Sequence, residues 1–200
     1  MDRNIWNKWC ILGLAATAIA NTSGCMVLAP VTAATAGMVA LDERSAGTVM
    51  DDAGIITKIK TEFATNGDAD SIFTKVSVNS YEGRVLLSGT VKTEDAKEEA
   101  AKAAWSVHGV KEVINVIHIA PSPENKAKDA WIAGQINTKL IAESRLSSMN
   151  YKVDVNDGVV YLLGLAQNQE ELDKALAIAS NVSGVKKVEN YVLLKDERRR

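Results

Sequence analysis

The side chains best suited to a binding chemistry are an aromatic ring and two nearby lysines. Trp131 follows Lys126 and Lys128 in the segment K-A-K-D-A-W-I. An indole beside ammonium groups suits an anionic bilayer interface, where the ring enters the headgroup region and the lysines meet lipid phosphates. Small or uncharged residues on the same side of a helix would complete this candidate lipid-binding face: Gly134, Gln135 and Thr138.

A helix must present this face. Ile132, Ile136 and Leu140 recur at four-residue spacing, which predicts the buried stripe of an amphipathic helix. Trp131 precedes Ile132 by one position and therefore projects about 100° away from that stripe. The alternative is that the Trp131 ring folds over the edge of its own domain or against another domain.

The sequence contains no recognisable catalytic or metal-binding set. His108 and His118 have no third ligand at metal-site spacing. There is no G-x-S-x-G, no phosphate-binding glycine loop and no nucleophile with a base and an orienting group. We therefore expect a protein that is not an enzyme, with no metal and no cofactor. The formal net charge of −2 also gives no indication of a nucleic-acid surface.

The N-terminal residues predict an exported lipoprotein. Arg3 and Lys8 precede an uncharged stretch over residues 10–20, which is too short to span a bilayer and is typical of a secretory signal. The signal ends T-S-G-C and resembles the bacterial lipobox, in which the cysteine, here Cys25, is acylated and becomes the first residue. Thr22 stands where an aliphatic residue is usual. The alternative is an ordinary cleaved signal in which Cys25 has no role.

The residues after Cys25 bear on localisation. In Gram-negative lipoproteins an Asp directly after the cysteine favours the inner membrane, so Met26 predicts the outer membrane, on its periplasmic face. Residues 26–41 carry no charge. We interpret them as part of a flexible tether, with an interfacial segment as the alternative.

An internal duplication organises the rest of the chain. The pattern V-x-V…G-x-V-x-L-x-G…G-V-x-x-V-x-N begins at Val76 and again at Val153. Val76 pairs with Val153, whereas Gly83 pairs with Gly158 at an offset smaller by two. We therefore place a two-residue length difference at the tip of a hairpin.

Each copy predicts a helix, two strands joined by a tight turn, a second helix and a third strand. The stripe of the first helix consists of Ile55, Ile59 and Phe63. Glu82 and Gly83 form the turn, and Thr93 caps the second helix. Asp51 and Asp52 offer N-cap oxygens for the first helix, and Asp129 in the second copy corresponds to Asp52. The predicted fold class is α+β: two tandem α-β-β-α-β domains, each a three-stranded mixed sheet packed against two helices.

The N-terminal motifs and the internal duplication give the expected boundaries. These are a lipoprotein signal peptide over residues 1–24, a lipidated N-terminus and tether over 25–50, a first domain over 51–120, a linker over 121–128, a second domain over 129–195 and a basic tail over 196–200.

The repeated pattern resembles the BON domain (bacterial OsmY and nodulation). Two copies after a lipobox and the segment D-E-R-S-A-G-T-V-M-D-D, residues 42–52, are similar to the dual-BON lipoproteins of Gram-negative outer membranes. The resemblance implies binding of anionic phospholipid, of the phosphatidylglycerol or cardiolipin class, through the first helix of the second domain. It also implies a role in outer-membrane integrity, cell division and the stress response. Trp131 lies on that helix.

A protein-interaction module is the main alternative. The sheets, or Trp105, would then dock an envelope assembly or cell-wall factor. What the two copies share is most simply scaffold. Function is expected where they differ, above all at Trp131, whose counterpart is Gly54.

Overall fold

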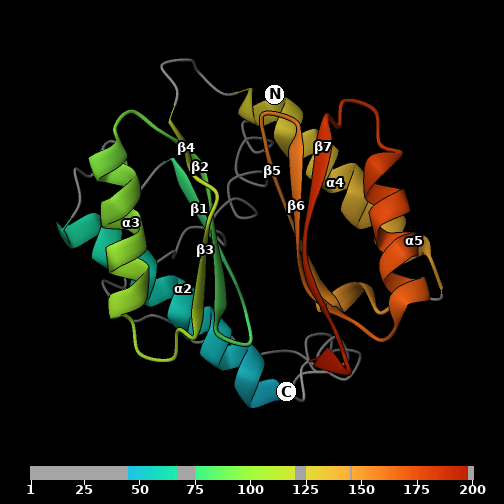
Figure 1. Cartoon of the computed structure of the whole chain (residues 1–200), viewed down its shortest axis with the longest axis horizontal. Coiled ribbons are helices and arrows are strands. Elements are labelled where there is room, and N and C mark those ends of the chain that lie inside the picture. Colours follow the sequence, from blue (N-terminus) through green and yellow to red (C-terminus); the bar gives the residue numbers. More distant parts are fainter. Residues whose placement is uncertain (1–44, 67–74, 120–124, 145, 198–200) are drawn as a thin grey trace, which may run out of the picture. The chain divides into compact units, whose positions relative to one another are not determined.

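The structure, a computed structural model, describes residues 45–66, 75–119, 125–144 and 146–197. The predicted signal peptide, Cys25, most of the tether and residues 121–124 of the predicted linker lie outside these residues, whereas residues 126–128 of that linker are helical. The described residues form two α+β domains with the same order of elements, which confirms the predicted fold class (Figure 1).

The elements of the first domain are α2 (Ala46–Asn66), β1 (Val76–Tyr81), β2 (Arg84–Val91), α3 (Glu94–Ser106), β3 (Glu112–Asn115) and β4 (His118–Ile119). β1 pairs antiparallel with β2, while β3 and β4 both pair parallel with β2 in one continuous register. The predicted third strand is therefore divided between β3 and β4. Between β3 and β4, the Val116 N–H donates to the Leu87 carbonyl and the Ile117 N–H donates to the Asn115 side-chain carbonyl.

The elements of the second domain are α4 (Lys126–Ala142), a short 3-10 helix η1 (Ser148–Asn150), β5 (Tyr151–Asn156), β6 (Val159–Ala166), α5 (Gln169–Ser180) and β7 (Lys187–Leu194). β5 pairs antiparallel with β6, and β7 pairs parallel with β6 over its whole length. The third strand is continuous here, unlike that of the first domain.

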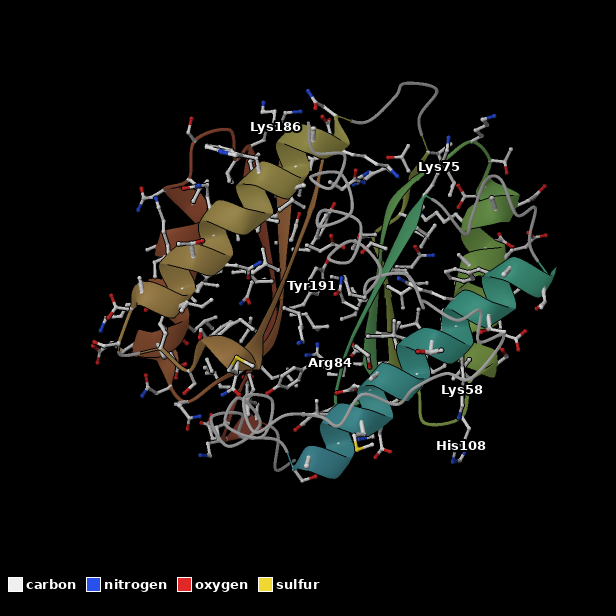
Figure 2. All side chains as sticks on the ribbon, turned by 180° about the vertical axis from the view of Figure 1, so that it is seen from behind. Lys58, Lys75, Arg84, His108, Lys186 and Tyr191 are labelled. Carbon is white, nitrogen blue, oxygen red and sulfur yellow. The ribbon has the colours of Figure 1, made fainter. Side chains whose placement is uncertain are left out.

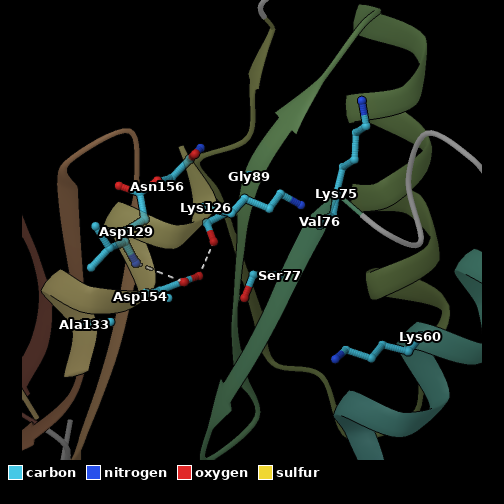
Figure 3. A pocket seen from close by; sticks show the side chains of 13 residues that line it. Lys60, Lys75, Val76, Ser77, Gly89, Lys126, Asp129, Ala133, Asp154 and Asn156 are labelled. Carbon is cyan, nitrogen blue, oxygen red and sulfur yellow. Dashed lines mark hydrogen bonds between the residues drawn. The ribbon is translucent and has the colours of Figure 1, made fainter. Parts of the chain in front are cut away.

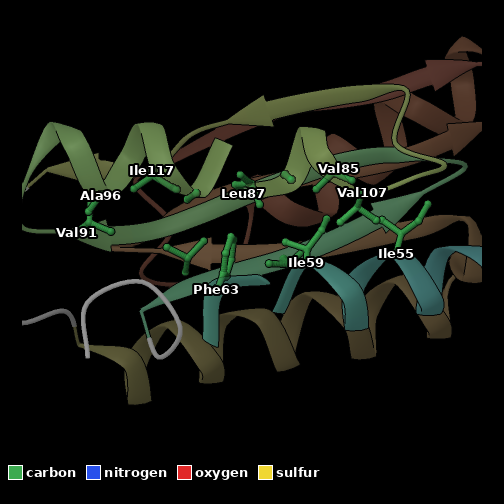
Figure 4. Close-up of a cluster of buried hydrophobic side chains, with 13 residues drawn as sticks. Ile55, Ile59, Phe63, Val85, Leu87, Val91, Ala96, Val107 and Ile117 are labelled. Atoms are coloured by element: carbon green, nitrogen blue, oxygen red, sulfur yellow. The ribbon is translucent and has the colours of Figure 1, made fainter. Parts of the chain in front are cut away.

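Each sheet packs both helices of its domain on one face (Figure 1). In the first domain the predicted stripe of Ile55, Ile59 and Phe63 is buried in one cluster with Val85 and Leu87 of β2 (Figure 4). The corresponding stripe of α4 is buried in the second domain: Ile132, Ile136 and Leu140. Burying one such side chain contributes roughly 1.5–3 kcal/mol, so each stripe suffices to orient its helix against the sheet.

The prediction that Asp51 or Asp52 caps the first helix was wrong, and Asp129, the counterpart of Asp52, is not a cap either. α2 begins at Ala46, well before Asp52. The N-cap of α4 is Asn125, whose side chain accepts a hydrogen bond from the Lys128 N–H. The Asp129 N–H is itself bonded to the Asn125 carbonyl, so this aspartate lies inside the helix.

The two aspartates instead attach the first helix of each domain to its hairpin turn. The buried Asp52 carboxylate accepts hydrogen bonds from the N–H groups of Glu82 and Gly83, at 2.8 and 2.9 Å. Asp129 makes the same two bonds, of 2.8 and 2.9 Å, to residues 157–158. Both turn residues have positive φ, 56° and 81° in the first domain, as a two-residue type I′ hairpin requires. The carboxylate satisfies N–H groups that such a turn leaves unpaired.

The two-residue length difference between the copies was also misplaced. Val76 lies opposite Gly89 in the first hairpin, and Tyr151 lies opposite Gly164 in the second. Val76 therefore corresponds to Tyr151 and not to Val153, and the hairpins are equal in length. The difference lies before the first strand. A shift of two residues keeps every side chain on the same face, so the V-x-V pattern could not reveal it.

The two sheets contact each other through the faces that their helices leave uncovered. An apolar cluster there combines residues of the first domain with residues of the second: Tyr81, Leu86, Ile114, Tyr161, Leu163 and Leu165. At its edge, Arg84 donates a 2.9 Å hydrogen bond to the Tyr191 carbonyl (Figure 2). Polar bonds from Asn79 and Ser88 to Asp154 add to the contact. The two domains are therefore joined by a third buried apolar cluster, which lies between their sheets.

Candidate functional site

Trp131 lies on the outer side of α4. Its side chain is 53% exposed, whereas the next residue, Ile132, is fully buried. The angular separation expected from the sequence is therefore present. More than half of the residue is open to solvent, so the Trp131 ring is not enclosed by its own domain.

Four of the other predicted residues share the Trp131 side of the helix. Lys128, Gly134, Gln135 and Thr138 are all exposed and lie within about 60° of Trp131 around the helix axis. The Thr138 hydroxyl donates a 2.8 Å hydrogen bond to the Gly134 carbonyl, so it is not directed outward as a free donor. We call these five residues the Trp131 face.

Lys126 does not belong to the Trp131 face. It lies about 140° from Trp131 around the axis of α4. Together with Ala130 and Ala133, which follow at helical spacing, it lines a groove between the two domains. Lys126 and Lys128 are close in sequence, which suggests one lysine cluster. Because they are two positions apart on a helix, they lie on different sides of α4.

Ile141 is an apolar residue of α4 that the sequence analysis missed. Its side chain is 70% exposed, more than that of Trp131. Ile141 lies about 15 Å further along the helix and about 80° around it, with Gly134 and Thr138 at angles between the two. The sequence did offer an indication, because Ile141 directly follows the stripe residue Leu140. A residue in that position points about 100° away from the buried stripe and is expected to be exposed.

Trp105 on α3 shows that exposure alone does not single out Trp131. Its side chain is 55% exposed, almost the same as that of Trp131. The helices differ in charge. α3 carries four acids and two lysines, whereas α4 carries three lysines and a single acid, Asp129, which is buried and bonded to the hairpin. Of the two tryptophans in the described part of the chain, Trp131 therefore lies on a helix with an excess of lysines and Trp105 on one with an excess of acids.

The hairpin beside α4 moderates this positive charge. Lys186 forms a 2.9 Å ion pair with Asp157. The hydrogen bond and charge of Lys186 hold the pKa of Asp157 below its ordinary value, with smaller contributions from Lys128 and His118. Asp157 thus remains ionised near Lys128 at neutral pH, and the net field of the face comes from the lysines along α4.

Among the described residues, no group of three or more His, Cys, Asp or Glu side chains is placed to hold a metal ion. No helix in the described ranges combines the length and apolarity that a membrane span requires.

Comparison with known proteins identifies the fold. The family model of the BON domain matches residues 51–121 and 128–196. The chain belongs to the BON domain family. The two matched segments correspond to the two α-β-β-α-β units, so the protein is a tandem of BON domains.

Three relatives match most of the BON tandem. "Outer membrane lipoprotein DolP" of Haemophilus influenzae is 38% identical, over 82% of this chain and 86% of the relative. "Osmotically-inducible protein Y" of Escherichia coli is 36% identical, over 72% and 73%. "Uncharacterized protein in gshII 5'region" of Anaplasma centrale is 40% identical, over 76% and 99%.

Proposed function

We propose that this protein is a non-catalytic lipoprotein of the outer membrane, anchored through acylated Cys25 on the periplasmic face, and that its second BON domain binds anionic phospholipid. The observation that carries the lipid contact is the exposed Trp131 on a helix with an excess of lysines. The relative named an outer-membrane lipoprotein supports the location. A role in envelope integrity follows if this contact places the protein at particular regions of the membrane.

The anchor and the Trp131 face have different tasks. Acyl chains contribute about 0.8 kcal/mol per buried CH₂. Transfer of one tryptophan ring contributes on the order of 2 kcal/mol, and each lysine near an anionic surface about 1 kcal/mol. Attachment therefore comes from Cys25. Because the anchor holds the protein at the membrane, the Trp131 face meets lipid at a high effective concentration. The face can then select lipid with an affinity too weak to attach the protein to the membrane by itself.

The positions of Trp131 and Ile141 define how α4 would meet the bilayer. With about 15 Å between them along the axis, both side chains enter the headgroup region only if the helix lies nearly parallel to the surface. Gly134 and Thr138 between them add little bulk, which allows the helix backbone to approach the lipid. Lys128 and Lys139, both exposed, are then available to lipid phosphates.

A matched pair of tryptophan substitutions tests this proposal. We consider the fragment of residues 42–200, which contains all three apolar clusters. Trp131→Glu is expected to lower its binding to phosphatidylglycerol vesicles by about tenfold or more, because it replaces the inserting ring with an acid. Trp105→Glu, an equally exposed tryptophan on the acidic helix α3, should leave binding within about twofold. Vesicle flotation measures both. Equal losses in the two variants, or none, would contradict the proposal.

Ile141→Glu provides a second test of the Trp131 face and of the helix orientation. It is expected to weaken vesicle binding by a similar factor without any change at Trp131. Ile119→Glu, at an exposed isoleucine of the first domain, is the control. If Ile141→Glu binds normally while Trp131→Glu does not, the helix meets the membrane end-on and not along its length.

The protein-interaction alternative makes a different prediction for the same variants. If Trp105 docks an envelope protein, crosslinking in cells recovers a partner that is lost in Trp105→Glu and kept in Trp131→Glu. The lipid proposal expects the membrane fraction of a Cys25→Ser chain to depend on Trp131 and to fall with added salt.

A further inference from the structure

The groove between the two BON domains is a second concave site, separate from the Trp131 face. Its volume is about 360 Å³, and both domains contribute to its lining. Three lysines are among its lining residues: Lys60 of α2, Lys75 directly before β1, and Lys126 in the first turn of α4. Figure 3 shows Lys126 extending toward strands β1 and β2 from the α4 side and Lys60 extending toward β1 from the α2 side, whereas the Lys75 side chain extends upward from the start of β1.

The two carboxylates in the lining already have their hydrogen-bond donors. Asp129 is bonded to the hairpin turn of its own domain. Asp154 accepts hydrogen bonds from the Ser88 hydroxyl and the Asn79 amide of the other domain. Even with both acids counted, the lining keeps an excess of positive charge. The ammonium groups of Lys60 and Lys75 have neither a hydrogen bond nor an ion pair with the described part of the chain.

Comparison of the two copies shows that the fold does not require these lysines. Asp52 and Asp129 are equivalent because they make the same bonds to their hairpins, and this alignment places Asn137 at the position of Lys60 and Val49 at that of Lys126. The strand register places Asn150 at the position of Lys75. None of the three counterparts is charged. Because the duplicated fold forms without a charge at the equivalent positions, we interpret these lysines as serving a ligand.

The remaining lining indicates the ligand's chemistry. Val76, Ala130, Ala133 and Val155 form apolar walls, and the Ser77 hydroxyl offers a donor beside the lysines. Flexible ammonium groups bind phosphate as point charges, without the fixed geometry that arginine imposes. We propose that this groove binds the phosphate group of a small phosphorylated organic molecule, either a free glycerophosphate or the headgroup of a phospholipid. The site does not rest on the function proposed for the Trp131 face, since it lies on a different side of α4.

The test uses the fragment of residues 42–200 and amide resonances followed by NMR. Titration with glycerol 3-phosphate is expected to shift the resonances around Lys60, Ser77 and Lys126. The double variant Lys60→Ala, Lys75→Ala should weaken the apparent affinity by about tenfold or more, because two of three cations are lost. Trp131→Glu should leave it unchanged. If Trp131→Glu abolishes the chemical-shift response to glycerol 3-phosphate, the phosphate binds at the Trp131 face, and the proposal of a phosphate site in the groove is wrong.

Two further double variants distinguish binding at the groove from non-specific electrostatic attraction. Lys58→Ala with Lys102→Ala removes the same charge from exposed positions outside the groove and should leave the shifts intact. Lys60→Arg with Lys75→Arg keeps the charge and should retain most of the affinity, which excludes misfolding as the cause of any loss. If the off-groove pair weakens binding as much as the groove pair, the effect is non-specific and the proposal is wrong.

The source of the phosphate is decided by a second arm. If glycerol 3-phosphate shifts the groove resonances, the site takes a free phosphorylated molecule. If only phosphatidylglycerol vesicles shift them, and the groove pair loses this response while inorganic phosphate gives none, the site takes a lipid headgroup. If none of the three probes shifts the groove resonances, the proposal is overturned.

Discussion

Asn79 and Asp154 occupy equivalent positions in the two BON domains and are hydrogen-bonded to each other, with 3.3 Å between Nδ2 and Oδ2. Each lies three residues before the turn of its hairpin. The two copies therefore meet through the same strand position. The contact is not symmetric in charge, because only one of the two residues is an acid, and Asp154 also accepts the Ser88 hydroxyl.

Removal of the Asp154 carboxylate should weaken the contact between the domains. Asp154→Ala leaves Asn79 and Ser88 without their acceptor in a partly buried position, which costs about 1–3 kcal/mol. Asp173→Ala is the control, since Asp173 accepts a side-chain hydrogen bond on the exposed surface of α5. It should cost less than about 0.5 kcal/mol. Urea unfolding measures the difference, and equal losses would show that the interdomain bonds contribute no stability.

The aspartate that holds each hairpin should be a strong determinant of stability. In Asp129→Ala the buried N–H groups of the 157–158 turn lose a charged acceptor, with an expected cost of roughly 2–4 kcal/mol. Asp51→Ala, an exposed neighbour of the equivalent Asp52, should change the free energy of unfolding by less than about 0.5 kcal/mol. A thermal unfolding midpoint for Asp129→Ala equal to that of the unmodified chain would contradict this role.

Glycines of strand and helix should respond in opposite ways to the same substitution. Gly89 in β2 has φ 122°, and a methyl group there would overlap the Lys75 carbonyl oxygen. Gly89→Ala should therefore destabilise the chain by more than about 2 kcal/mol. Gly134 in α4 has open space around it, so Gly134→Ala should stabilise by up to about 1 kcal/mol through helix propensity. Chemical denaturation of both variants tests the opposite signs.

Tyr161 should make the protein sensitive to alkali. Burial, and then the charges of Tyr191, Glu189 and Asp154, raise the pKa of Tyr161 to about 12 from its ordinary 10.0. The folded state thus keeps a neutral phenol that the unfolded chain ionises near pH 10. The resulting stability is fully present below pH 10 and is lost as the pH rises toward 12.

The measurement for Tyr161 compares urea unfolding midpoints between pH 9 and pH 11.5. Tyr161→Phe should be less stable at pH 9, because the 2.8 Å hydrogen bond to His118 is gone, but should lose less stability as the pH rises. Parallel pH profiles for the two proteins would show that Tyr161 ionises in the folded state as it does in the unfolded chain.

The stripes and turns of this protein could be predicted because they depend on local spacing. Ile132, Ile136 and Leu140 bury one side of α4 wherever the helix packs, and Trp131 must then face away. The same local reasoning failed for Asp52. An aspartate ahead of an apolar stripe has the pattern of an N-cap, and only the position of the 82–83 turn shows that its carboxylate serves a different segment.

The candidate site was predicted in part. Trp131 and Lys128 share one side of α4, as their spacing of one helical turn requires. Ile141 was missed because an isoleucine beside the stripe cannot be distinguished from a buried one without knowing where the sheet ends. The assignment of Lys126 to the same face overlooked the helical rotation between it and Trp131.

The sequence by itself determined the duplicated α-β-β-α-β fold, since periodicity, turn residues and the repeat are properties of neighbouring positions along the chain. The tertiary structure alone decided that the uncovered sheet faces pack together and that Lys60, Lys75 and Lys126 line one groove. Those residues come from elements far apart in sequence, and their proximity depends on how two complete domains pack, which no local pattern encodes.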